Sequence, residues 1–179
     1  MMPIGPLMIE HRLIERVIQV MKGQLDRIQA GEKIAPDLIG RLTDFIKIYA
    51  DRCHHGKEED ILFRDLSKRI ISPEHKRIME ELVEEHKLGR KITGALIDAT
   101  RKYEKGETEA LSMIADGLKS LVEFYPKHIE KEDKHFFLPV MAYFSKEEKD
   151  AMLSEGYEFD SRLFHQQFDF LVGAFGTKK

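Results

Sequence analysis

Apolar residues recur every three or four positions along four long segments of the chain, which places them on one face of an α-helix. The first segment covers about residues 7–28. Its apolar face contains Leu7, Ile14, Ile18, Met21 and Leu25. The other three segments cover about residues 36–66, 73–103 and 108–141. The pattern therefore predicts four long amphipathic helices.

Residues that start or end helices separate these segments. Gly31 and Pro36 bracket the loop between the first and second segments, and Gly106 lies between the third and fourth. Ser72 and Pro73 are the residue types favoured at the N-cap and at the first position of a helix. Four helices joined by short links predict an antiparallel, up-down-up-down four-helix bundle.

The C-terminal part of the chain is also expected to be helical. Ser145 and Glu148 have the capping-box spacing, which predicts a short fifth helix. A last helix is expected over about residues 158–175. We therefore predict an all-α fold with additional short C-terminal helices. It would form one domain over residues 1–179, with the bundle at about 7–141 and a helical extension at about 145–176.

The composition is that of a globular protein. Charged residues make up 34% of the chain, hydrophobic residues 42%, and the formal net charge is −3. There is no long basic run and no apolar stretch of roughly 18–20 residues, so neither nucleic acid nor a membrane is an expected partner. The single cysteine, Cys53, excludes an internal disulfide, and the N-terminus lacks a signal-peptide pattern. We therefore expect a cytoplasmic protein.

Two motifs occur twice in the chain. Glu-His-Arg-Leu at residues 10–13 matches Glu-His-Lys-Leu at residues 85–88, and HHGKEEDILF at 54–63 matches HIEKEDKHFF at 128–137. In this register His54 corresponds to His128, and Glu58 corresponds to Glu132. The chain therefore reads as two helix hairpins. Each has a histidine on its first helix and a His-x-x-x-Glu pair on its second.

The second predicted helix offers two alternative His-x-x-x-Glu pairs, because residues four apart share a helix face. The repeat register selects His54 and Glu58 rather than His55 and Glu59. Helical steps back from His54 follow an apolar line that includes Ala50, whereas steps back from His55 follow a more polar line. We therefore expect His54 and Glu58 to face the core, and His55 and Glu59 to lie on the flank of the helix.

Four histidines and two glutamates are thus predicted on the inward faces: His11, His54, Glu58, His86, His128 and Glu132. Burying such groups unpaired costs several kcal/mol for each charge, and a bound cation offsets that cost. One zinc ion takes about four ligands. Six ligands fit two octahedral ions better, each with two histidines and both sharing two carboxylates. Imidazole and carboxylate without thiolate favour iron, ahead of manganese and zinc.

The motifs E-H-R-L, H-H-G-K-E-E-D-I-L-F, E-E-H-K-L and H-I-E-K-E-D resemble those of the hemerythrin-like (HHE cation-binding) family. The resemblance covers about residues 7–141. It implies an antiparallel four-helix bundle with a non-haem di-iron centre, bridged by an oxo or hydroxo group. Carried over position by position, it implies the same six ligands that the repeat selects.

The chain differs from the oxygen-carrying hemerythrins at two places. Those proteins have a fifth histidine one helical turn after the histidine of the third helix, where this chain has Arg90. They also have an aspartate five residues after the last histidine, where this chain has Asp133, but Glu132 fits the internal repeat better. The set of four histidines and two glutamates is more similar to di-iron proteins proposed to repair iron–sulfur centres under nitrosative stress. Those usually carry an N-terminal cysteine-bearing domain, and this chain begins almost at His11.

Several other side chains are candidates for additional roles at the centre. His135 lies one turn after Glu132 and is a candidate hydrogen-bond partner or ligand. His165 would supply a fifth histidine if the C-terminal helix covered the open end of the bundle. Tyr125 is a candidate donor to a metal-bound ligand, and Cys53 adjoins His54 in the sequence.

Three functions are compatible with such a centre. The first is binding of a small diatomic ligand, oxygen or nitric oxide, for sensing, scavenging or storage. The second is a stress-response role that acts on peroxide or nitric oxide, or supplies iron for repair of iron–sulfur centres. The third is an interaction module in which the metal is structural. An apolar C-terminal segment leaves a homodimer or another protein partner open.

Overall fold

The computed structural model describes the backbone of residues 1–175 and the side chains of residues 1–166. Within that part of the chain the structure is helical and contains no strand, which confirms the all-α prediction. Two helices of the bundle are regular along their whole length. Helix α1 spans Ile4–Gln29 and helix α4 spans Pro73–Glu104.

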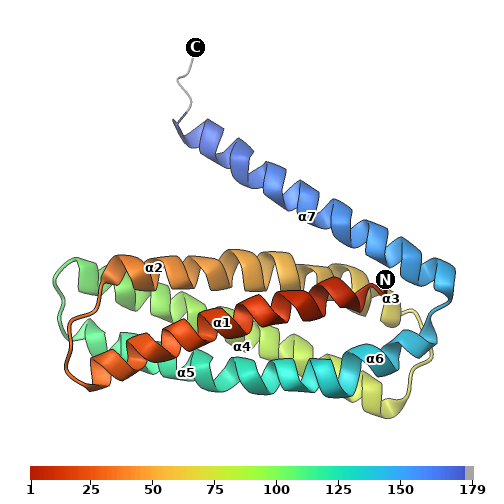
Figure 1. Cartoon of the computed structure of the whole chain (residues 1–179), viewed down its shortest axis with the longest axis horizontal. Coiled ribbons are helices and arrows are strands. Elements are labelled where there is room, and N and C mark those ends of the chain that lie inside the picture. The colour runs from red at the N-terminus through yellow and green to blue at the C-terminus, as the bar shows by residue number, and fades with distance from the viewer. Residues whose placement is uncertain (176–179) are drawn as a thin grey trace.

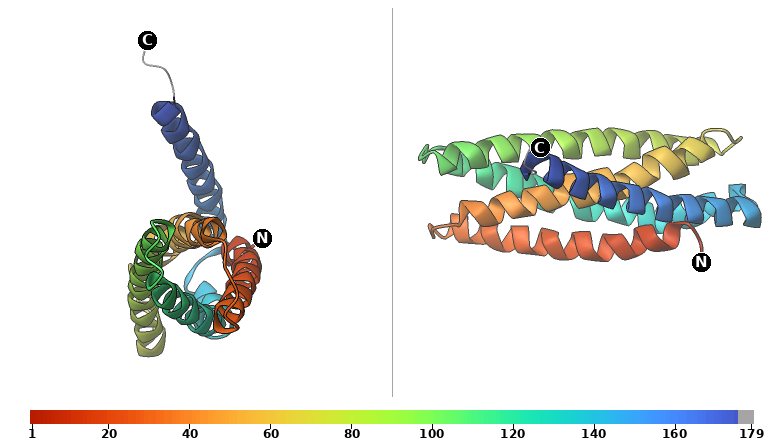
Figure 2. Two further views of the ribbon diagram at one scale, coloured as in Figure 1. Left: turned by 90° about the vertical axis from the view of Figure 1, so that its left-hand side faces the viewer. Right: turned by 90° about the horizontal axis from the view of Figure 1, so that it is seen from above.

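The other two helices of the bundle are composite. The second consists of α2 (Pro36–Phe45), η1 (Ile46–His55), η2 (Glu58–Phe63) and α3 (Arg64–Leu66). The fourth consists of α5 (Ala110–Lys131), η3 (Glu132–Phe136), α6 (Phe137–Val140) and η4 (Met141–Tyr143). Segments η1, η2 and η3 are π-helical, and η4 is a 3₁₀ turn. Successive helices run in opposite directions in Figure 1, and the end-on view in Figure 2 shows them around a common centre.

The helix ends follow the predicted signals. The Ser72 hydroxyl accepts a hydrogen bond from the His75 amide at 3.1 Å, which caps α4. Gly31 and Gly106, after α1 and α4, have φ values of 74° and 92°. That left-handed conformation closes the C-terminus of a helix and favours glycine there.

The C-terminal part forms one helix rather than the two short helices expected. Helix α7 spans Lys146–Phe175 without interruption. Its start has the predicted capping box, because the Ser145 amide donates to Glu148 at 2.8 Å and the Glu148 amide donates to Ser145 at 3.2 Å. Figure 1 shows that α7 begins beside α6 and then diverges from the bundle. Glycine within a helix costs only about 1 kcal/mol, so Gly156 does not end α7.

The bundle core has two apolar clusters that lie on either side of a buried polar layer. One cluster is built on Ile14, Ile18 and Met21 of α1 with residues of α4 and α5. The other is built on Ile4 and Leu7, at the start of α1, with residues of η2 and α6. His11 lies between these two sets in the sequence and is fully buried. The polar layer therefore interrupts the core where the predicted metal-binding side chains lie.

None of the helices described in the structure is long and apolar enough to cross a membrane.

Candidate metal centre

The structure brings all six predicted side chains into the buried polar layer. Each of them is at most 2% exposed to solvent. They come from the four helices of the bundle: His11 from α1, His54 from η1, Glu58 from η2, His86 from α4, His128 from α5 and Glu132 from η3. Side chains separated by up to about 120 positions in the sequence therefore meet at one point.

Three of the six lie in π-helical segments. His54 belongs to η1, Glu58 to η2 and Glu132 to η3. A π-helix closes its hydrogen bonds at i→i+5 rather than i→i+4, and such turns concentrate at functional sites. Because each residue then advances less around the axis, neighbouring side chains face more nearly the same direction.

The potential ligand atoms form two groups. Those of His11, His54, Glu58 and Glu132 lie within 4.8 Å of one another, and so do those of His55, His86 and His128. The two groups are joined by the two glutamates, each of which contacts a histidine of both groups.

Each glutamate spans the two groups with its two oxygens. Glu58 Oε1 lies 3.3 Å from Nε2 of His54, and Oε2 lies 3.3 Å from Nε2 of His86. Glu132 Oε2 lies 3.1 Å from Nε2 of His11, and Oε1 lies 3.3 Å from Nε2 of His128. Each carboxylate therefore lies between the two groups, with one oxygen towards each.

Each of the four predicted histidines has a carboxylate at its outer ring nitrogen. The Nδ1–O distances are 2.8 Å for His11–Asp133, 2.8 Å for His54–Glu10, 2.6 Å for His86–Glu59 and 2.9 Å for His128–Glu85. An ionised carboxylate only accepts hydrogen bonds, so Nδ1–H is assigned as the donor. Nε2 then points to the centre, the orientation in which proteins hold metal-binding histidines.

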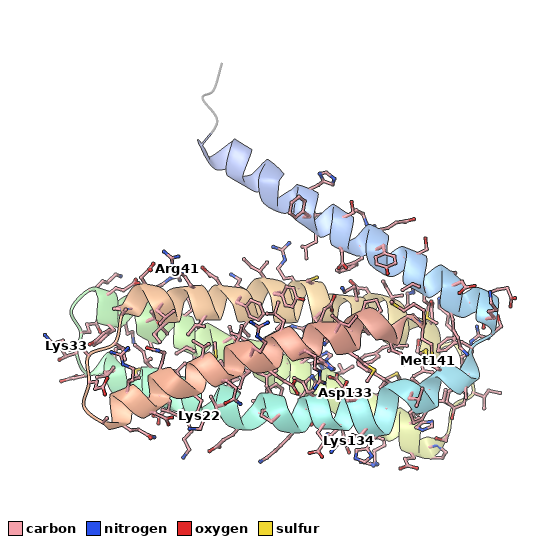
Figure 3. The ribbon with its side chains drawn as sticks, viewed as in Figure 1. Lys22, Lys33, Arg41, Asp133, Lys134 and Met141 are labelled. Carbon is pink, nitrogen blue, oxygen red and sulfur yellow. The ribbon has the colours of Figure 1, made fainter. Side chains whose placement is uncertain are left out.

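Basic side chains neutralise these outer carboxylates. Glu10 contacts Lys57, and its counterpart in the repeat, Glu85, accepts from Lys131 at 2.5 Å. Asp133 contacts Arg12, and Glu59 accepts from Arg90 at 2.7 Å. In Figure 3, Asp133 lies between the ribbons of α1 and of the helix that continues α5. Asp133 is therefore an outer partner of His11, whereas Glu132 occupies the centre.

Several buried polar atoms at the centre have no hydrogen-bond partner among the described residues. They are both oxygens of Glu58 and of Glu132, Nε2 of His86 and of His128, and both ring nitrogens of His55. Buried polar atoms are almost always paired, and leaving them unpaired costs free energy. Bound cations would satisfy these nitrogen and oxygen atoms together. The donor set is imidazole and carboxylate without thiolate, which suits iron or manganese.

The charges at the centre strongly perturb its ionisation. Burial alone would lower the pKa of His54, but the charge of Glu58 and the hydrogen bond to Glu10 raise it to about 10. Burial would also lower the pKa of His86. Hydrogen bonds to Glu132, Glu58 and Glu59 outweigh burial and raise this pKa to about 11. The pKa of Glu132 is lowered to about 2, because neighbouring histidines outweigh burial and the charge of Glu58. Without metal, protons on the histidines therefore balance the two buried carboxylates.

Nε2 of His11 and Nε2 of His54 approach to 2.9 Å. In the neutral tautomers assigned above, both atoms would present lone pairs to each other. A proton in the metal-free protein, or a metal ion, removes that repulsion. Protons and metal therefore compete for the same atoms.

The expectation that His55 lies on the flank of its helix was wrong. His55 is 2% exposed, and its ring stacks on that of His86 with centroids 3.9 Å apart and planes at 13°. The sequence argument assumed α-helical geometry, whereas η1 is π-helical and ends at His55. The neighbouring histidine doublet was the only sequence signal for this residue. Glu59 is partly exposed and binds His86 from outside, as an outer partner.

Neither of the two other candidate histidines reaches the centre. His135 is exposed, so it is neither a ligand nor a hydrogen-bond partner of Glu132. His165 is exposed on α7 and does not supply a fifth histidine. Arg90, at the position of the fifth histidine in oxygen carriers, binds Asp51 at 2.7 Å and Glu59. Cys53 donates to Asp160 at 3.2 Å.

A third acidic group lies next to the centre but is already neutralised. Potential ligand atoms of Glu10, Cys53 and Asp160 lie within 4.8 Å of one another. Lys57 contacts Glu10, and its Nζ lies 2.8 Å from Asp160. An ammonium group therefore takes the place that a cation would have there, and this cluster connects α7 to the outer carboxylate of His54.

A pocket of about 320 Å³ opens beside the centre. Its lining includes the buried side chains of His55 and Tyr125, and the exposed basic side chains of Lys47 and Arg90. Burial raises the pKa of Tyr125 far above its usual value, so its hydroxyl stays protonated. The pocket therefore reaches His55 of the histidine layer from the surface.

The sequence was compared with protein-family models, with curated proteins and with solved structures. Neither the curated proteins nor the solved structures give a match. The family model described as the hemerythrin HHE cation binding domain matches residues 2–138, which include all six predicted ligands and all of the bundle except the end of its fourth helix. With histidine and glutamate clusters at the expected place in the bundle, the chain belongs to the hemerythrin HHE cation-binding family.

Proposed function

We propose that this protein holds two iron ions and binds a small diatomic ligand, oxygen or nitric oxide, at that centre. The observation that carries the proposal is the position of Glu58 and Glu132. Each places one oxygen near a histidine of one group and the other oxygen near a histidine of the other group. Two carboxylates that span two histidine groups suit a dinuclear site better than a single ion.

The proposed ligands are His11 and His54 at one ion, His86 and His128 at the other, and Glu58 and Glu132 as bridges. A non-haem di-iron centre supplies electrons and open coordination positions for reversible binding of such a ligand. The protein orients the six side chains through the outer carboxylates and keeps bulk water away with the two apolar clusters. The pocket that reaches His55 and Tyr125 supplies access.

The sensing, scavenging or storage roles all require reversible binding, whereas a stress-response role requires turnover or release of iron. The free thiol of Cys53 and its half-buried position suit a reducing cytoplasm, which we propose as the compartment. A compartment of that kind would also keep the iron available in its reduced form.

The test is metal analysis of protein purified without oxygen, followed by exposure to oxygen or nitric oxide. Close to two irons per chain is expected, with an optical spectrum that changes on exposure and returns on degassing. The variant carrying both His54→Ala and Glu58→Ala should lose most of the iron. A single zinc per chain, or no metal, would overturn the proposal. Catalytic loss of peroxide or nitric oxide above free iron would assign the stress-response role instead.

A further inference from the structure

His55 is buried in the histidine layer without a hydrogen-bond partner. Neither Nδ1 nor Nε2 is paired with any described residue, although the side chain is 2% exposed. The nearest carboxylate oxygen, Oδ1 of Asp51, is 3.6 Å from Nδ1, beyond hydrogen-bonding distance. That carboxylate is already bound by Arg90. A histidine that only packs in a core normally pairs at least one ring nitrogen.

His55 lies directly beside two of the proposed ligands. One of its ring nitrogens lies within 4.8 Å of ligand atoms of both His86 and His128. Its ring is stacked on His86 and lies edge-on to His128, with centroids 5.5 Å apart. These two histidines form the second of the two proposed ion positions.

The internal repeat gives His55 no counterpart. In the register that aligns His54 with His128, His55 aligns with Ile129, which is 3% exposed and belongs to the apolar core. The six predicted ligands obey the two-fold relationship of the repeat. His55 departs from this two-fold relationship, because only the first hairpin has a histidine at this position.

We propose that His55 is a third histidine ligand of the ion position formed by His86 and His128. This inference rests on the proposed dinuclear centre. It makes the two ions inequivalent, with three histidines at one position and two, His11 and His54, at the other. The ion with two histidines then keeps more coordination positions for exchangeable ligands. In oxygen-carrying hemerythrins the fifth histidine lies on the third helix, at the position of Arg90. Here the fifth histidine would come from the second helix.

The experiment compares metal binding by the full chain and by His55→Ala. Metal-free protein is titrated with Co²⁺, whose absorption spectrum reports ligand number, and the loss of each ion to a chelator is followed. For His55→Ala we expect one of the two ions to be lost at least about tenfold faster than in the unchanged protein. His135→Ala and His165→Ala, which remove exposed histidines, are expected to leave both rates unchanged.

Two further measurements separate loss of a ligand from loss of packing. His55→Gln, which keeps much of the side-chain volume, should show the same selective loss of one ion. Added imidazole should slow that loss in His55→Ala, because the pocket opens at this residue. Two ions with unchanged chelation rates and spectra in both variants would overturn the role of His55. Fewer than two ions in the unchanged protein would instead overturn the dinuclear proposal.

Discussion

Glu10 Oε2 lies 2.8 Å from Nδ1 of His54, and Glu10 directly precedes His11, a proposed ligand on another helix. The same relationship joins Glu85, which directly precedes His86, to His128 at 2.9 Å. Both copies of the repeat contain this Glu-His pair. In each pair the histidine is a proposed ligand, and the glutamate orients a second proposed ligand on another helix. Lys57 and Lys131 hold the two glutamates in place. The internal repeat therefore encodes both the ligands and their outer partners.

This relationship predicts a loss of metal affinity in Glu10→Gln. The amide cannot take the full charge-assisted hydrogen bond from His54, so the imidazole becomes a weaker and less well oriented ligand. We expect metal affinity to fall about 10- to 100-fold, measured by competition with a chelating dye. Glu84→Gln, an exposed position beside Glu85, is the matched control and should have no effect. Equal affinities for the two variants would show that Glu10 does not orient a ligand.

Metal loading should release protons. The pKa values of His54 and His86, about 10 and about 11 in the metal-free protein, exceed the ordinary histidine value of 6.5. At pH 8 both rings hold protons that a metal ion must displace. Metal affinity should therefore rise as the pH increases from 6 towards 10, and a pH indicator should report proton release during the metal titration. An affinity independent of pH in this range would contradict the proposed ligands.

The stability of the metal-free protein should fall as the pH rises above neutral, whereas the metal affinity should rise. Stabilisation from the raised pKa values of His54 and His86 is fully present below about pH 6.5 and is lost as the pH rises through about 10 to 11. Stabilisation from Glu132, whose pKa is lowered to about 2, is present above about pH 4.5 and is lost as the pH falls. Denaturant unfolding of metal-free protein should therefore show a falling free energy of unfolding from pH 7 to pH 10. Metal-loaded protein should not show that fall.

Cys53 should be a slowly reacting thiol. Burial raises its pKa to about 12, although Lys57 opposes this, and Asp160 accepts the thiol hydrogen bond. Since the thiolate is the reactive form, alkylation at pH 8 should be more than about tenfold slower than in unfolded protein. Asp160→Asn should speed the reaction, because it removes a negative charge beside the sulfur. Mass spectrometry of the alkylated protein measures both rates. An unchanged alkylation rate in Asp160→Asn would contradict the contact between Cys53 and Asp160.

Gly56 and Gly23 should respond differently to alanine. A Cβ at Gly56 would lie 2.8 Å from Cζ of Phe159 on α7, whereas a Cβ at Gly23 has no atom within 4 Å. Gly23→Ala should gain about 0.5–1 kcal/mol of unfolding free energy from helix propensity. Gly56→Ala should gain less or lose stability, because Phe159 must move. Faster hydrogen exchange over residues 150–165 in Gly56→Ala alone would locate the effect in α7. An equal gain in both variants would contradict this packing.

The helices of the bundle could be predicted because their apolar residues follow a regular period and their ends carry local signals. The repeat added the positions of His11, His54, Glu58, His86, His128 and Glu132, since the two copies constrain each other. The continuity of α7 could not be predicted, because a glycine and a few polar residues resemble a helix break when neighbouring contacts are unknown. The outer carboxylates were missed for a related reason. Each lies on a different helix from the histidine that it orients.

The sequence by itself determined the all-α bundle, the family and six of the residues that face the centre, because helical periodicity and the internal repeat can be read from the sequence alone. Only the tertiary structure decided which nitrogen of each histidine faces inward, which carboxylate binds it, and that His55 joins the buried layer. Those outcomes depend on contacts between helices and on the π-helical geometry of η1, which turns His54 and His55 toward the same centre. Periodicity based on 3.6 residues per turn assigns these two neighbours to different faces.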